Sequence, residues 1–248
     1  MSNNTLENLH HEANAKAYIT DYWRERATGF TKLRQQELQS EKYQLWQQEI
    51  ARHLSEGKSL NILDVGCGAG FFSVLLAKGG HRVTGIDLTP AMVEQAQLLT
   101  AEQHCEAHFM VMDAEKLSFA DNSFDVVIAR NVTWNLPHPD AAYAEWLRVL
   151  RQGGLLLNYD AEYARDHHRQ LPAHNAHATV TEDLLERCHH IYHMLDVSLY
   201  DRPAWDAALL QKLGAHAVTI DKAVGSRIYA QEDDFYIPAP MFGVFATK

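Results

Sequence analysis

Two acids and a glycine-rich turn are the residues of this sequence whose types and spacing could bind a ligand. Asp64 lies inside ILDVGCGAGFFS, two residues before the run of alternating glycines that begins at Gly66. Asp87 lies 23 residues after Asp64, at the end of a second apolar run. Glycine lets a chain turn sharply and lets a ligand come close to the backbone. The spacing therefore predicts a ligand site where two strands end.

The same residues argue against a nicotinamide dinucleotide. Its fingerprint requires a glycine at the sixth position of the turn, and the sixth residue counted from Gly66 is Phe71. A carboxylate at Asp64 would face a pyrophosphate unfavourably, but it suits a ligand with a positive amino group. A carboxylate at Asp87 can accept hydrogen bonds from the two hydroxyls of a ribose. These residues predict a nucleoside with an ammonium-bearing arm, which is the shape of S-adenosylmethionine.

The stretch ILDVGCGAGFFS resembles the first motif of class I S-adenosylmethionine-dependent methyltransferases, and GID, which ends at Asp87, resembles their second motif. The resemblance continues through FMVMDAEKLSFADNSFDVVIARNVTWNL and EWLRVLRQGGLLLNYD, and it covers about residues 60–160. It is greatest for the small-molecule branch, which includes ubiquinone-biosynthesis enzymes. The resemblance implies an enzyme that transfers the methyl group to an oxygen, nitrogen, sulfur or carbon atom and releases S-adenosylhomocysteine.

The resemblance also implies where the cofactor would bind. The turn at Asp64 would line the methionine end, Asp87 would hold the ribose, and Asp113 would accept a hydrogen bond from the adenine amino group. Met92 would cover the adenine, although ordinary helix packing explains it equally well. The expected cofactor residues are Asp64, Gly66, Cys67, Gly68, Asp87, Leu88, Met92, Asp113, Ala114 and Asn131.

In this family the methyl acceptor binds between N-terminal helices and an insertion near the fifth strand, which here correspond to residues 10–35 and 161–200. Asp160 and Tyr22 are the candidate catalytic proton acceptors, with a capping role as the alternative for Asp160. The alternatives are helix packing for Trp23, core packing for Trp134, a solvated side chain for Arg26 and a helix start for Arg202. The expected substrate-binding residues are Trp23, Arg26, Trp134, Tyr163 and Arg202.

A histidine-rich segment raises the question of a metal site. In the predicted helix near residues 181–195, His189 and His193 are one turn apart, a spacing at which two imidazoles can share a metal. We interpret them instead as the polar face of a surface helix and predict no metal. The histidines of the segment are His167, His168, His174, His177, His189, His190 and His193.

The positions of these residues require alternating strands and helices. Apolar runs that alternate with helical patterns from residue 60 onward predict a doubly wound, mostly parallel seven-stranded α/β sheet. The segments AVTIDK and MFGVFAT could form an antiparallel pair at its edge, and HPDAAYAEWLRVLRQGG is predicted to be a helix that ends at its glycines. We divide the chain into an N-terminal helical lid, residues 1–56, and a methyltransferase domain, residues 57–248, with 161–200 as a cap insertion.

The charge balance of the chain limits the binding partners that we expect. The net charge is −10 and no basic stripe is visible, so we expect a small-molecule acceptor and no nucleic acid. A nucleic-acid or protein methyltransferase on the same fold and a non-catalytic cofactor-binding module remain the alternatives. Without a membrane-length apolar run, a secretory leader or a disulfide pattern, the chain is expected in the cytoplasm. The sequence leaves the choice between monomer and homodimer open.

Overall fold

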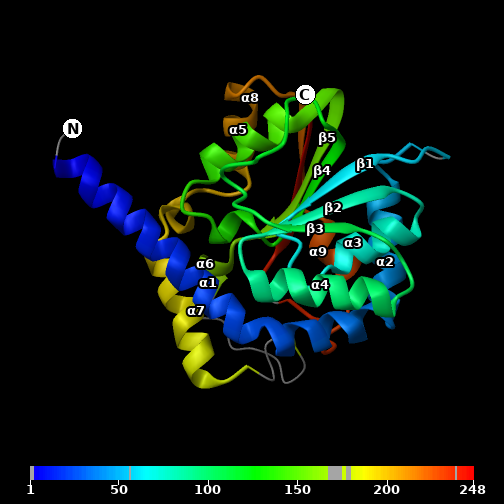
Figure 1. Ribbon diagram of the computed structural model, residues 1–248, viewed down its shortest axis with the longest axis horizontal. Helices are drawn as coiled ribbons and strands as arrows, with labels where there is room; N and C mark the ends of the chain where they lie inside the picture. Colours follow the sequence, from blue (N-terminus) through cyan, green and yellow to red (C-terminus); the bar gives the residue numbers. More distant parts are fainter. Residues whose placement is uncertain (1–2, 56, 167–174, 177–179, 238) are drawn as a thin grey trace.

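The computed structural model describes residues 3–55, 57–166, 175–176, 180–237 and 239–248, and in residues 3–13 and 165–166 it describes the backbone alone. Figure 1 shows a central twisted sheet with helices on both faces. The helices are α1 (Asn3–Leu38), α2 (Glu41–Ala51), α3 (Phe71–Lys78), α4 (Pro90–Glu102), α5 (Pro139–Val149), α6 (Tyr163–Asp166), α7 (Glu182–Met194), α8 (Ala204–Lys212), α9 (Val224–Ile228) and the short 3₁₀ turns η1 (Thr133–Asn135) and η2 (Asp196–Leu199). The strands are β1 (Asn61–Val65), β2 (Arg82–Asp87), β3 (His108–Val111), β4 (Phe124–Arg130), β5 (Leu150–Ala161), β6 (His216–Asp221) and β7 (Met241–Thr247).

The sheet has the strand order β3-β2-β1-β4-β5-β7-β6. The pairs from β3 to β5 are parallel, whereas β7 runs antiparallel to both β5 and β6. The prediction of a mostly parallel seven-stranded sheet with an antiparallel pair at its edge is confirmed. Because the order reverses at β1 and β4, the carboxyl ends of these strands border the crevice in which such sheets bind ligands.

Both faces of the sheet are buried. In β1, Leu63 packs into a cluster with residues of α5 and α8, whereas its neighbour Ile62 packs into a cluster with residues of α2, α3 and α9. The same alternation occurs at Val127 and Val126 in β4. Near-continuous apolar strands are expected where helices cover both faces.

One helix end differs from its prediction. The helix α5 ends at Val149, and the two glycines that were expected to end it, Gly153 and Gly154, lie within β5. Their backbones pair with the last residue, because Gly153 donates to the Lys248 carbonyl (3.0 Å) and Lys248 donates to the Gly154 carbonyl (3.1 Å). Tertiary pairing therefore extends the strand through a segment that the local sequence marks as a helix end.

The long helix α1 crosses the molecule beside α4 and α7 (Figure 1). Tyr22 of α1, Ile191 of α7 and Trp134 of η1 belong to one buried cluster, and Tyr163 packs against both this cluster and the sheet cluster that contains α2, α3 and α9. The helices α1 and α7 therefore meet beside the loop that follows β4. In the described part of the chain, no helix is long and apolar enough to cross a membrane.

Candidate active site

The glycine turn after β1 forms one wall of a cavity at the carboxyl ends of the strands. Gly66 and Gly68 have φ angles of +59° and +52°, a conformation that side chains disfavour. A Cβ atom on Gly66 would lie 2.5 Å from the Val132 side chain, and one on Gly68 would lie 3.2 Å from Phe30. The backbone of the turn is thus held close to α1 and to the loop after β4, and larger residues at these positions would push against Val132 and Phe30.

Asp64 is a buried carboxyl group beside this turn, with 2% of its surface exposed. Burial raises its pKa to about 7, and the nearby negative charge of Asp87 also raises it, while a hydrogen bond from Ser73 and the charge of Arg130 lower it. The Ser73 hydroxyl donates to the carboxyl at 2.6 Å. A cationic group of a ligand would stabilise the ionised form. Asp64 is therefore suited to an ammonium partner.

Asp87 ends β2 and anchors the turn. Its two oxygens accept hydrogen bonds from the backbone amides of Gly68 (3.0 Å) and Thr89 (2.8 Å). Burial raises the pKa of Asp87, and these amide donors lower it. A carboxylate has about four acceptor positions, so Asp87 keeps capacity for two ligand hydroxyls.

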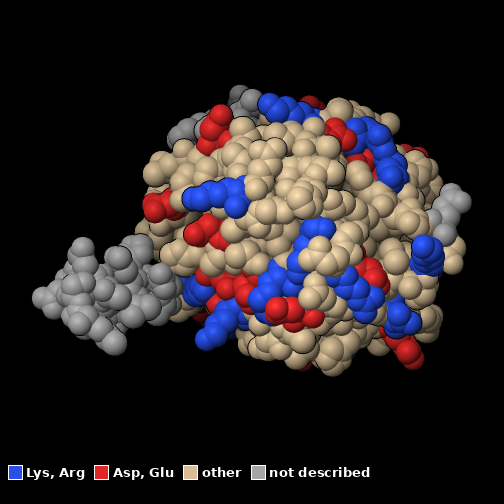
Figure 2. Space-filling model, turned by 90° about the horizontal axis from the view of Figure 1, so that it is seen from above, with Lys and Arg blue, Asp and Glu red and all other residues tan. Residues whose placement is uncertain are grey.

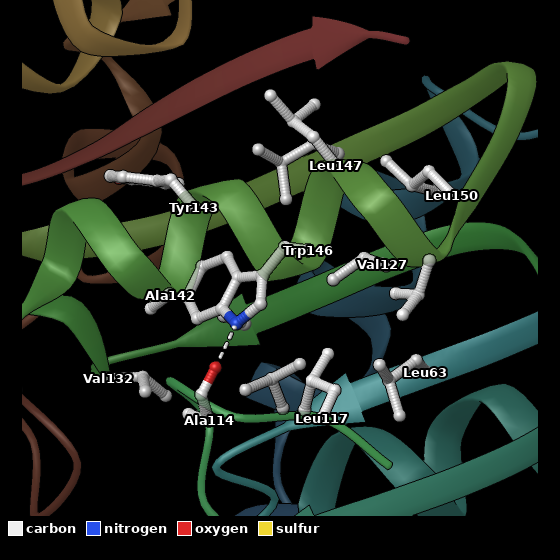
Figure 3. Packing of buried hydrophobic residues seen from close by; sticks show 14 of the residues in the cluster. Leu63, Ala114, Leu117, Val127, Val132, Ala142, Tyr143, Trp146, Leu147 and Leu150 are labelled. Carbon is white, nitrogen blue, oxygen red and sulfur yellow. Dashed lines mark hydrogen bonds between the residues drawn. The ribbon is translucent and has the colours of Figure 1, made fainter. Parts of the chain in front are cut away.

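Asp113 lies in the loop that follows β3, at the far end of the cavity. It accepts hydrogen bonds from the Glu115 amide (2.9 Å) and from Lys16 of α1 (2.7 Å). The Lys16 ammonium also pairs with Glu115. Figure 3 shows how the loop is fixed from behind, where the buried Trp146 indole donates to the Ala114 carbonyl at 3.0 Å. The core under α5 thus positions this end of the cavity.

The loop after β4 lines the cavity next to the glycine turn. Asn131 has φ +58°, and its buried side-chain oxygen Oδ1 has no hydrogen-bond partner in the structure. The Trp134 indole donates to the Asn131 carbonyl at 2.9 Å, which keeps the loop tight. A buried acceptor without a donor is costly, so Oδ1 is poised to bind a donor from a ligand.

Asp160 and Arg202, predicted as a base and as a substrate clamp, do not line this cavity. Both are buried and form an ion pair at 3.0 Å. Asp160 also accepts hydrogen bonds from the Thr133 hydroxyl and the Trp134 amide (2.9 Å), and Arg202 pairs with Asp206 at 2.8 Å. These bonds engage the Asp160 carboxylate, which the predicted role as a base would need, and the Arg202 guanidinium, which the predicted role as a substrate clamp would need. The arrangement gives both residues a positioning role, since they hold the loop that carries Trp134.

Tyr22, the other predicted base, does line the cavity. It is buried, and burial together with the neighbouring Cys188 raises the pKa of its hydroxyl well above its ordinary value. A phenol that stays neutral donates a hydrogen bond more readily than it removes a proton. The position of Tyr22 in the cavity wall agrees with a substrate contact, whereas its raised pKa does not favour a role as a base.

Two arginines of the cavity wall, Arg34 and Arg130, were not among the site residues predicted from the sequence. Arg34 of α1 and Arg130 at the end of β4 both line the cavity, and both pair with the fully buried Glu37, at 2.5 Å and 2.7 Å. The Arg130 guanidinium also lies 4.9 Å from the centre of the Phe71 ring. A polar residue that ends a strand is a signal that could have identified Arg130.

The cavity brings most of the predicted residues together. Every predicted cofactor residue lines it, as do four of the five predicted substrate residues, Arg202 being the exception. The cavity wall also includes Phe30, Phe72, Cys188 and Tyr192. The predicted cofactor residues that line it are Asp64, Gly66, Cys67, Gly68, Asp87, Leu88, Met92, Asp113, Ala114 and Asn131, and the predicted substrate residues that line it are Trp23, Arg26, Trp134 and Tyr163.

The histidine segment falls only partly within the structure. His167, His168, His174 and His177 lie outside the described residues. Within the described ranges, no group of three or more histidine, cysteine or acidic side chains is arranged to hold a metal ion.

Comparison with known proteins agrees with this geometry. A family model described as a methyltransferase domain matches residues 63–158. A 2-methyl-6-phytyl-1,4-hydroquinone methyltransferase from Synechocystis is 40% identical over 130 residues, which are 52% of this chain and 40% of that protein. The chain thus spans about two fifths of the length of this relative.

Solved structures show the same fold. An S-adenosylmethionine-dependent methyltransferase from Aquifex aeolicus superposes with a TM-score of 0.60 at 17% identity and covers 89% of this chain and 97% of its own. Phosphoethanolamine N-methyltransferase 2 of Haemonchus contortus, in complex with S-adenosyl-L-methionine, gives a TM-score of 0.58 at 19% identity and covers 82% of this chain and 52% of its own.

Proposed function

We propose that this chain, whose residues 63–158 match a methyltransferase domain, is an S-adenosylmethionine-dependent methyltransferase that acts on a small-molecule acceptor. One observation carries the proposal. Asp64, Asp87 and Asp113, which lie at or just beyond the carboxyl ends of three neighbouring strands, all line one cavity beside a turn in which Gly66 and Gly68 have positive φ angles. When bound, S-adenosylmethionine supplies an electrophilic methyl group on a sulfonium sulfur.

The residues present fit this cofactor. Asp64 and the unpartnered Oδ1 of Asn131 are acceptors for an ammonium group. Asp87 would accept from the ribose hydroxyls, and Asp113 from the adenine amino group. The Lys16 ammonium already occupies one Asp113 oxygen at 2.7 Å, so adenine would share that carboxylate with α1.

The chain contributes to the reaction by orienting the reactants and excluding water. Trp23 packs edge-on against Phe30 (5.5 Å between ring centres) and approaches Trp134 (6.5 Å). These rings connect α1 to the loop after β4 and cover the side of the cavity next to the glycine turn. Alignment of two reactants in a site without water is a large source of rate enhancement. Tyr22 would donate a hydrogen bond to the acceptor.

A small molecule fits the cavity better than a macromolecule does. Its acceptor side is walled by buried residues of α1 and α7, among them Tyr22 and Tyr192. On the face that Figure 2 shows, Lys and Arg side chains lie among Asp and Glu side chains and do not form a separate basic patch. We further propose that residues 1–56 act as a lid and 161–200 as a cap. A reducing cytoplasm suits the three cysteines, none of which forms a disulfide.

Titration calorimetry with S-adenosylhomocysteine tests the proposal. The wild type should bind it saturably and should not bind NAD. Asp87→Asn should weaken binding by at least about tenfold, because a charged acceptor for two hydroxyls is lost. Glu94→Gln, on the exposed face of α4, removes a negative charge away from the cavity and should bind as the wild type does. A wild type that does not bind S-adenosylhomocysteine would refute the proposal.

A further inference from the structure

Three arginines, Arg26, Arg34 and Arg130, line the cavity. Arg130 also lies near enough to Asp64 to lower the pKa of that carboxyl group. Glu37 is paired with both Arg34 and Arg130, so two cations share one anion there. A bound sulfonium would add a further positive charge nearby. A buried charge is stabilised only by an opposite charge or by hydrogen bonds.

Arg26 is the guanidinium with the fewest partners. It is 9% exposed, and its Nε has no hydrogen-bond partner. In the described part of the chain, its polar neighbours are the Tyr22 hydroxyl and the Cys188 thiol, and no carboxylate forms an ion pair with it. Burial raises the pKa of both neighbours, so both remain neutral. The positive charge of Arg26 is therefore not compensated by these residues.

We infer that the methyl acceptor carries an anionic group, a carboxylate or a phosphate, and that the Arg26 guanidinium binds this group inside the cavity. The inference rests on the proposed function and specifies its substrate class. Arginine binds such groups through two parallel hydrogen bonds. The neighbouring walls are aromatic, with Trp134 and Tyr192 ring centres 5.2 Å apart, so the rest of the acceptor is apolar.

Paired ligands test this charge preference without knowledge of the natural acceptor. Calorimetry in the presence of saturating S-adenosylhomocysteine would compare indole-3-acetate with indole-3-acetamide, benzoate with benzamide, and phenyl phosphate as a further anion. The wild type should bind each acid about tenfold or more tightly than its amide, the value of one charge-assisted hydrogen bond. Arg26→Gln should abolish this preference, and Arg26→Lys should keep part of it.

A matched control variant and a second cofactor ligand show whether Arg26 binds an anion of the acceptor or the carboxylate of the cofactor. Arg24→Gln removes the same charge from the exposed face of α1 and should keep the full preference. Arg26→Gln should bind S-adenosylhomocysteine as tightly as the wild type does. If it instead weakens S-adenosylhomocysteine but not the decarboxylated analogue, Arg26 holds the cofactor carboxylate and the inference is wrong.

Three further results would overturn the inference that Arg26 binds an anionic acceptor. Equal affinity of the wild type for acids and amides would refute the inference even if Arg26→Gln did not fold, since that comparison needs no variant. Failure of every acid to bind while S-adenosylhomocysteine binds would refute the inference but leave the proposed function intact. Failure of S-adenosylhomocysteine itself to bind would refute both.

Discussion

Replacement of Asp64 by Asn should stabilise the ligand-free protein, and the gain should grow with pH. In the folded protein the Asp64 pKa is about 7, compared with an ordinary value of 3.8. A carboxyl group whose pKa is raised by folding stabilises the folded state fully only below its unfolded value, and this contribution disappears as the pH rises through the folded value. Above pH 7, the folded state must therefore either ionise the buried Asp64 carboxyl group or hold a proton that the unfolded state releases, and both disfavour folding.

The size of the effect follows from the two pKa values. At 1.36 kcal/mol for each pH unit, the ionisable group disfavours folding by about 4 kcal/mol at pH 8 and by about 2 kcal/mol at pH 5. Asn does not titrate, so Asp64→Asn should gain about 2–3 kcal/mol relative to the wild type between pH 5 and pH 8. Any constant packing effect of the amide cancels in this difference.

Urea denaturation at pH 5 and pH 8, without ligand, measures this quantity. Glu94→Gln controls for the loss of a negative charge from an exposed site. A stability difference between Asp64→Asn and the wild type that is the same at both pH values would refute the reasoning. If the carboxylate is also the ammonium partner of the cofactor, the stabilised variant should lose affinity for S-adenosylhomocysteine.

Three further predictions concern the ionisation of Asp64, the glycine turn and the ion pair between Asp160 and Arg202. Wild-type affinity for S-adenosylhomocysteine, measured by calorimetry, should rise about tenfold from pH 6 to pH 8 as Asp64 ionises, and a flat profile would contradict this. Gly66→Ala should lose at least about tenfold in this affinity, because its Cβ would lie 2.5 Å from Val132 at φ +59°; unchanged binding would show that the turn can move. Arg202→Gln should lower the free energy of unfolding by about 3–5 kcal/mol, since it leaves Asp160 buried without its cation, and an unchanged urea midpoint would argue against this role.

The residues predicted to bind the cofactor lie together because the motifs that contain them are local in sequence. Asp64 is the penultimate residue of β1 and Asp87 is the last residue of β2, and parallel strands bring their carboxyl ends to one edge regardless of what covers them. The motifs therefore carry both the residue types and their relative positions. Every predicted cofactor residue accordingly lines the cavity.

The acceptor side was less predictable because its contacts are distant in sequence. Arg130 meets Glu37 across 93 positions, and nothing near either residue indicates the other. Asp160 lies near the carboxyl end of β5, where a catalytic base could lie, but its burial and its pairing with Arg202 depend on how the chain after β5 folds back. Solvent access and partner choice are tertiary properties, and a strand-end position alone does not determine them.

The continuity of α1 has a consequence for kinetics. Lys16 bonds to Asp113 at one end of the cavity, and Arg34 pairs with Glu37 beside Arg130 at the other. Eighteen residues of unbroken helix, about 27 Å, separate these contacts. Because a helix without an internal loop does not uncover one end independently of the other, cofactor and acceptor would exchange through a shared opening. Departure of the demethylated cofactor and of the methylated product would then share one opening step.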